Sequence, residues 1–213
     1  MLWGGFEGEL ELRRARDGGS RLRGRFPYNK PAVLSDGGRT GRPRKEVIAP
    51  GAFSYRLDMP DEDIHLLVGH SYDRPLASRK AGTLDFKDTT EALIFDATIT
   101  EEMQRVSYVQ DALTAISAGL ILGISPGFRI PPARAVKNAE TVEDEGNDPA
   151  RGMHNAIIRT IWAALLYELS LVTRPAYPEA QVESRNWSPN AGGVVVPEKP
   201  DAGLRRTLNR WRP

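Results

Sequence analysis

The chain has 213 residues, 40% of them apolar and 27% charged, with a formal net charge of +1. It contains no cysteine, which excludes disulfides, thiolate metal sites and a cysteine nucleophile, and its three histidines leave little for a histidine-rich metal site. The near-neutral charge offers no nucleic-acid signature, and no apolar run approaches the ~20 residues that a membrane helix needs. We expect a soluble, cytoplasmic protein with neither a membrane nor a nucleic acid as partner.

Short strands separated by turns dominate the first half of the chain. Alternating or compact apolar runs predict strands at residues 6–12, 22–26, 64–68, 83–86 and 92–99. The first two and the last two of these strands are each separated by turn residues, which predicts two hairpins. A loop is expected at 35–45, where no side chain is apolar, and a short helix at 52–57.

One longer helix is predicted after these strands. Thr100 is expected to be its N-cap, and the two glutamates that follow lie where the positive end of the helix dipole favours carboxylates. Apolar residues continue at helical spacing from Met103 to Ile116. Gly119 is expected to end the helix.

The second half of the chain combines predicted strands with polar segments. Residues 121–130 have strand character but are expected to break at Ser125-Pro126-Gly127, and residues 157–172 predict two strands or one long bent strand. Between them, residues 133–155 are polar and acidic, and we assign them no secondary structure. From Asn186 onward the composition shifts to Pro, Gly, Asn and Ser.

These elements predict a β-rich α+β fold, a barrel or sandwich with helices packed on it. We expect one domain at residues 1–185, in which residues 133–155 form a polar loop insertion. Residues 186–213 are expected to form a flexible C-terminal tail.

Three polar residues lie within or at the end of apolar strand sequence, where burial is costly unless the group is paired or used. His70 closes one apolar run, Ser125 lies between small residues in a second, and Glu168 interrupts a third. A serine hydroxyl becomes a good nucleophile when an imidazole takes its proton and a carboxylate orients that imidazole. If the three side chains face one cleft, they supply the groups that acyl transfer needs.

Each of the three residues also has a purely structural interpretation. Ser125 could begin a turn at the Pro-Gly pair that follows it, and His70 could bond a backbone group at a strand end. Glu168 could form an ion pair with Arg159 or Arg174. Residue type and spacing alone do not decide between these interpretations and a catalytic one.

Four sequence blocks, at residues 46–53, 66–70, 123–128 and 167–180, resemble the HK97-type phage prohead protease family. The second block ends in Gly-His, the third reads Gly-Ile-Ser-Pro-Gly-Phe, and Pro75-Leu76 lies downstream of the second. The blocks occur in the family's order and span about residues 20 to 182. The resemblance implies a fold like that of the herpesvirus assemblins, a small closed or partly closed β-barrel with surrounding helices.

The resemblance also implies a function, a serine endopeptidase that cuts scaffold and capsid protein segments, and itself, during prohead maturation. Carried over residue by residue, Ser125 is the nucleophile, His70 the general base and Glu168 the orienting third member. The expected substrates are the major capsid protein and scaffold segments, inside the assembling prohead in the cytoplasm of a bacterial host. No metal or cofactor is expected, and formation of a homo-oligomer is left open.

The sequence departs from the family pattern at two places. Ser71 stands where an acidic residue is more usual, and Pro126 stands where a small aliphatic residue is more usual. Because proline has no N–H group, Pro126 cannot donate a hydrogen bond to an oxyanion. The N–H of Ser125 or Gly127, or a donor from another segment, would have to do so.

Alternatives remain for the third residue and for the function. Asp73 and His65 are alternative third members, although an uninterrupted strand would place His65 and His70 on opposite faces. One rival function is a catalytically inactive capsid-assembly or scaffold protein with the same fold, which Pro126 favours. Another is a metal-dependent hydrolase that uses His65, His70 and Asp73.

Overall fold

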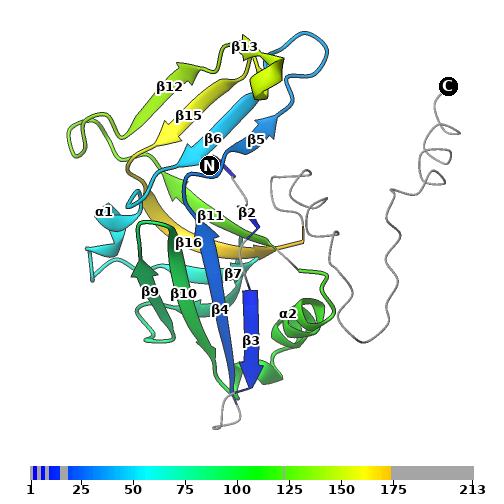
Figure 1. Ribbon diagram of the computed structural model, residues 1–213. Coiled ribbons are helices and arrows are strands. Elements are labelled where there is room, and N and C mark those ends of the chain that lie inside the picture. Colours follow the sequence, from blue (N-terminus) through cyan, green and yellow to red (C-terminus); the bar gives the residue numbers. More distant parts are fainter. Residues whose placement is uncertain (1, 4–5, 8–9, 15–18, 122, 174–213) are drawn as a thin grey trace, which may run out of the picture. The chain divides into compact units, whose positions relative to one another are not determined.

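The computed structural model describes residues 2–3, 6–7, 10–14, 19–121 and 123–173. Most of this part of the chain forms three β-sheets, with a separate two-stranded hairpin (Figure 1). None of its helices is long and apolar enough to span a membrane. The predicted tail at 186–213 lies outside the described residues.

The largest sheet, sheet A, has the strand order β1-β11-β16-β7-β8, and β2 also pairs with β11. Its strands are β1 (Leu2–Trp3), β2 (Phe6–Glu7), β7 (His65–Val68), β8 (Ser71–Ser78), β11 (Gly123–Arg129) and β16 (Leu165–Val172). β16 lies in the middle, antiparallel to β11 and parallel to β7 (Figure 1). This order places three segments that are far apart in the sequence on neighbouring strands.

Sheet B contains the two predicted hairpins, but the predicted strand at 6–12 is divided, because Phe6–Glu7 is β2 of sheet A and β3 begins at Leu10. It has the order β3-β4-β10-β9, and its strands are β3 (Leu10–Arg14), β4 (Ser20–Pro27), β9 (Leu84–Asp88) and β10 (Ala92–Ile99). The β3–β4 register sets Leu12 opposite Leu22, and burial along β4 alternates as the sequence pattern predicts. Edge-to-face contacts from Phe26 to Phe53, and from Phe53 to Phe128 of β11, connect sheets A and B through the core.

The predicted helices are present, but the longer one is divided. The short helix is α1 (Ser54–Leu57), and the longer one is a 3-10 turn, η1 (Met103–Arg105), followed by α2 (Ser107–Ser117). Thr100 is not the N-cap of either part, since Glu102 is that of η1 and Val106 that of α2, but its Oγ1 accepts the N–H of Met103 at 3.3 Å. Val106 separates the two parts because its backbone is extended, with ψ 130°, a conformation that β-branched residues favour. Gly119 ends α2 with φ +69°, as expected.

Sheet C occupies part of the segment to which we assigned no secondary structure. Its order is β12-β15-β6-β5, and its strands are β5 (Ala32–Ser35), β6 (Arg44–Ile48), β12 (Glu140–Asp144) and β15 (Ile157–Ile161). Beside it lie β13 (Asn147–Asp148), η2 (Pro149–Arg151) and β14 (Met153–His154). The polar composition of residues 133–155 misled the prediction, because here cross-strand ion pairs such as Arg159–Glu140 and Lys45–Glu145 compensate charged residues on strands.

The β-rich α+β class is confirmed, but the predicted closed or partly closed barrel is wrong. A barrel requires the first and last strands of one sheet to pair. In the described part of the chain, sheet B ends at β3 and β9, sheet C at β12 and β5, and sheet A at β8 on one side. The two α-helices described, α1 and α2, are too few and too short to surround a barrel.

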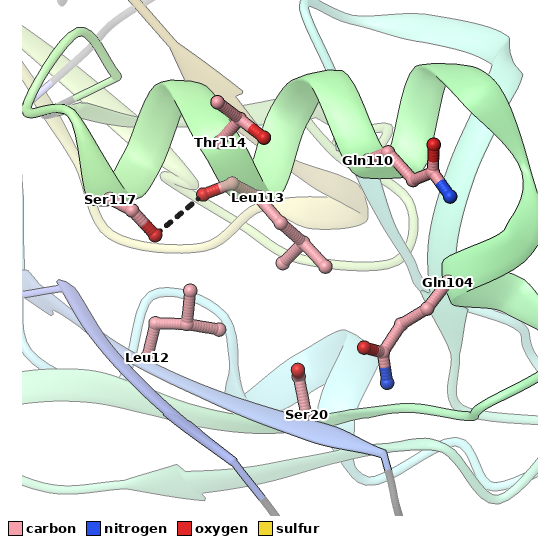
Figure 2. Close-up of a pocket in the computed structure, with 7 residues that line it drawn as sticks. All are labelled: Leu12, Ser20, Gln104, Gln110, Leu113, Thr114 and Ser117. Atoms are coloured by element: carbon pink, nitrogen blue, oxygen red, sulfur yellow. Dashed lines mark hydrogen bonds between the residues drawn. The ribbon is translucent and has the colours of Figure 1, made fainter.

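A groove of about 690 Å³ separates α2 from β3 and the start of β4. In Figure 2, Leu113 of α2 and Leu12 of β3 enter this groove from opposite sides. Its lining residues are Leu12, Ser20, Gln104, Gln110, Leu113, Thr114 and Ser117. None of the three candidate catalytic residues is among them.

Candidate active site

Two adjacent strands, β11 and β16, carry two of the three candidate residues. Their antiparallel register sets Ser125 opposite Ser170 and Gly127 opposite Glu168, so all four positions lie on one face of sheet A. Ser125, Glu168 and Ser170 are buried. The predicted break at Ser125-Pro126-Gly127 is wrong, because β11 runs through it and Ser125 lies within a strand rather than at the start of a turn.

The third candidate, His70, lies in the tight turn that joins β7 to β8. Gly69 and His70 form the whole turn, since Val68 already pairs with Ser71, and both have positive φ, +62° and +61°. A left-handed backbone is uncommon for a residue other than glycine. The N–H of His70 donates to Ser170 Oγ at 2.9 Å, which ties this turn to β16. The turn therefore brings His70 to the site through a bond to the neighbouring strand.

The imidazole of His70 is bound to the carboxylate of Glu168. His70 Nδ1 lies 2.8 Å from Glu168 Oε1, and Ser170 Oγ donates to the other carboxylate oxygen, Oε2, at 2.6 Å. An ionised carboxylate only accepts hydrogen bonds, so with Glu168 in that form His70 Nδ1 is the donor in this contact. The carboxylate side chain is 2% exposed and that of His70 is 17% exposed, so the pair is largely shielded from water. Ser170, Glu168 and His70 thus form one hydrogen-bonded chain.

Among the described residues, Glu168 forms no ion pair with an arginine, which its structural interpretation would require. Arg159 pairs with Glu46 at 3.1 Å and with Glu140, not with Glu168, while Arg174 lies outside the described residues. The carboxylate that contacts His70 Nδ1 is that of Glu168.

The two residues weighed as alternatives to Glu168 lie in other surroundings. His65 Nε2 lies 3.4 Å from Asp63 and its ring contacts that of Tyr72, while Asp73 is exposed on β8. His65 and His70 do not share an unbroken strand, because β7 ends at Val68, so strand alternation does not set their relative faces. In the described part of the chain, no three His, Asp or Glu side chains are grouped as metal ligands would be.

Comparison with known proteins identifies the family of the chain. A family model described as caudovirus prohead serine protease matches residues 32–191, which include β7, β11, β16 and all three candidate residues. The chain belongs to this family. No curated protein and no solved structure gives a significant match. Membership confirms the resemblance seen in the sequence and places the chain among serine peptidases that act in phage capsid maturation.

Sequence reasoning missed two features of this candidate site, the hydrogen bonds of Ser170 and the space that Gly127 leaves beside Glu168. Ser170 lies two positions after Glu168 and therefore on the same face of β16. This spacing within a predicted strand could have indicated Ser170 from the sequence. Gly127 lies directly opposite Glu168, and a Cβ atom at this position would come within 1.9 Å of Glu168 Oε1 and 2.7 Å of its Cδ. The glycine provides the space that the carboxylate occupies.

Gly127→Ala is expected to displace the Glu168 carboxylate and to lower kcat by roughly 10²-fold, because a misplacement of ~1 Å at a catalytic group has an effect of this size. Peptide-cleavage kinetics of the purified variant would measure the change. Gly82→Ala is the control for a loss of stability alone: its φ of +66° strains alanine, but a Cβ there meets nothing within 4 Å and does not touch Glu168. Near-wild-type kcat in Gly127→Ala would show that the carboxylate position is not critical.

Proposed function

We propose that the protein is a serine endopeptidase that cleaves scaffold and major capsid protein segments, and its own chain, inside the assembling prohead. The observation that supports this best is the 2.8 Å contact between His70 Nδ1 and the buried Glu168 carboxylate. That carboxylate shares one face of sheet A with Ser125, on the adjacent strand. A histidine oriented by a buried carboxylate beside a serine is the arrangement that activates a hydroxyl.

In the proposed mechanism, His70 Nε2 takes the proton of Ser125 Oγ as this oxygen attacks the carbonyl carbon of the scissile peptide bond. Glu168 stabilises the imidazolium that forms and stays ionised. The imidazolium then gives its proton to the leaving amine, and the C–N bond breaks to leave an ester on Ser125. Water, deprotonated by His70, hydrolyses the ester and restores the serine.

Ser170 is proposed to position these groups rather than to react. Its Oγ accepts the N–H of His70 and donates to Glu168 Oε2, so one hydroxyl holds the backbone of the base and the carboxylate that orients it. Ser170 is completely buried, which keeps water from replacing either bond. Hydrogen bonds of this kind hold catalytic residues in place and so prevent the small displacements that lower the reaction rate.

Pro126 favours a second candidate function, an inactive capsid-assembly or scaffold protein. Since Pro126 has no N–H, the oxyanion that forms during attack needs a donor elsewhere. The N–H groups of Ser125 and Gly127, or a donor from another segment, are the candidates. An inactive protein would retain the hydrogen-bonded chain of Ser170, Glu168 and His70 but would lack such a donor.

The proposed function is tested by producing the protein together with the major capsid protein and following both chains by intact mass. We expect both to be trimmed at defined bonds, with or without a chelator. A serine-reactive phosphonate should stop the trimming and add one adduct, mapped by peptide sequencing to Ser125. If both chains stay at full length and no adduct forms, the assembly-protein function is supported instead. Trimming that the chelator stops would support the metal-dependent hydrolase.

A further inference from the structure

The face of sheet A that carries Ser125 continues beyond the proposed catalytic groups. Because side chains alternate along β11, Arg129 lies on the same face as Ser125 and Gly127. The register of β11 and β16 shifts between Gly127 and Phe128, which makes Tyr167 the extra residue of a β-bulge beside Glu168. Bulges redirect side chains next to functional sites. Here the bulge brings the Tyr167 ring to 5.8 Å from the guanidinium of the exposed Arg129.

A second arginine contacts the same ring. Arg56 of α1 places its guanidinium 5.0 Å from the centre of the Tyr167 ring. Arg56 is 8% exposed and pairs with Glu62 at 2.9 Å, and its buried Nε has no hydrogen-bond partner in the described structure. Arg129, in contrast, forms no ion pair with any described carboxylate. No described carboxylate therefore lies within ion-pair distance of its positive charge.

Tyr72 of β8 lies near the same groups. It is 52% exposed, and its hydroxyl is a hydrogen-bond donor. Burial raises the pKa of Tyr72, the negative charge of Glu168 raises it further, and Arg129 and Arg56 act in the opposite direction. His65 lies opposite Glu168 in the parallel register of β7 and β16, and the Tyr72 ring lies 5.8 Å from the His65 ring, so Tyr72 lies on the part of sheet A that carries Glu168.

We propose that Arg129, Tyr167 and Tyr72 form a substrate subsite that binds an acidic side chain of the peptide being cut. This inference rests on the proposed function, which it extends from the reaction to the sequence of the substrate. The planar guanidinium of Arg129 can donate two parallel hydrogen bonds to a carboxylate. Its contact with the Tyr167 ring restricts the orientations of the guanidinium before the substrate binds. The Tyr72 hydroxyl supplies a further donor.

The distance along β11 indicates where in the substrate the acidic residue lies. Arg129 follows Ser125 by four strand residues, or ~13 Å at about 3.3 Å per residue. An extended peptide covers the same distance in roughly four residues. The acidic side chain is therefore expected about three to five residues from the scissile bond, on one side of it.

The test profiles cleavage of a proteome-derived peptide library by the full-length wild type, Arg129→Gln, Arg129→Glu and the control Arg134→Gln. Arg134 is also exposed but precedes β12, outside the proposed subsite. The wild type and Arg134→Gln should cut peptides with Asp or Glu at one such position about tenfold more often than those without, as expected for a charged hydrogen bond. Arg129→Gln should lose this preference, and Arg129→Glu should prefer Lys or Arg at the same position.

A matched pair of peptides, with Glu or Gln at the selected position, distinguishes a loss of the subsite from poor folding of a variant. In Arg129→Gln the ratio of kcat/KM for the two peptides should fall from about ten to about one, whatever the fraction of active enzyme. A wild type that cuts peptides without an acidic preference, or the same preference in Arg129→Gln, overturns the subsite and leaves the protease function standing. A wild type that cuts no peptide overturns the protease function and the subsite together.

Discussion

Ser125→Ala is expected to lower kcat for peptide cleavage by on the order of 10⁶-fold, to the level that substrate binding alone supports. Alanine cannot form the ester on which the proposed mechanism depends, and no other nucleophile is expected to replace it. The fold should be retained, because the change removes one small buried hydroxyl from β11. Single-turnover kinetics with excess enzyme would measure the residual rate.

A second serine variant provides the control for Ser125→Ala. Ser117 is exposed at the end of α2, where its Oγ donates to the carbonyl of Leu113, and Ser117→Ala should keep the wild-type rate. Intact mass would show in the same samples whether each variant still cuts its own chain. Equal cleavage by Ser125→Ala and the wild type would exclude Ser125 as the nucleophile.

Glu168→Gln is expected to lower kcat by roughly 10⁴-fold while it changes KM little. A carboxylate accepts the Nδ1 proton of His70, whereas the amide of glutamine can present its NH₂ group and favour the tautomer with the proton on Nε2. That tautomer cannot take a proton from Ser125. The separate values of kcat and KM, measured from initial rates, would distinguish this effect from weaker substrate binding.

Ser170→Ala and Ser170→Thr keep the charge of the Glu168 carboxylate and test whether its position matters. Alanine removes both hydrogen bonds of Ser170, so kcat should fall by at least roughly tenfold, because one hydrogen bond to a charged group already contributes about that much. Threonine keeps the hydroxyl and should recover part of that loss.

If Glu168→Gln retained most of the wild-type kcat, Glu168 would not be the orienting residue and His65 would become the next candidate.

Local patterns in the sequence predicted the strands whose apolar residues alternate or form a compact run, but not β5, β6 or β8. The hairpins β3–β4 and β9–β10 follow from apolar alternation over a few residues, because alternation depends on which face of a strand is buried. The end of α2 at Gly119 was likewise predictable from a residue that tolerates positive φ. The segment at 133–155 was missed because its strands are polar and are held by ion pairs to residues distant in the sequence.

The path of the chain through Pro126 was also missed. Proline normally interrupts a strand because it cannot donate to the ladder, so a break at Ser125-Pro126-Gly127 was the reasonable prediction. The structure keeps β11 continuous there. Strand pairing with β16 on both sides of Pro126 outweighs the single donor that is lost.

The sequence by itself determined the residue types of the candidate site and the family to which the chain belongs. Ser125, His70 and Glu168 stood out because each is polar within apolar sequence or at its end, and because each lies in a block that resembles the family. These signals are local and do not depend on which strands become neighbours.

Only the tertiary structure decided which of these groups meet. His70 and Glu168 are 98 residues apart, and the parallel pairing of β7 with β16 is what brings their side chains together. The same pairing explains Ser170, which bonds both of them, and the antiparallel register with β11 explains why a glycine stands opposite the carboxylate. Strand order and register arise from burial of the whole sheet, so a short stretch of sequence does not contain them.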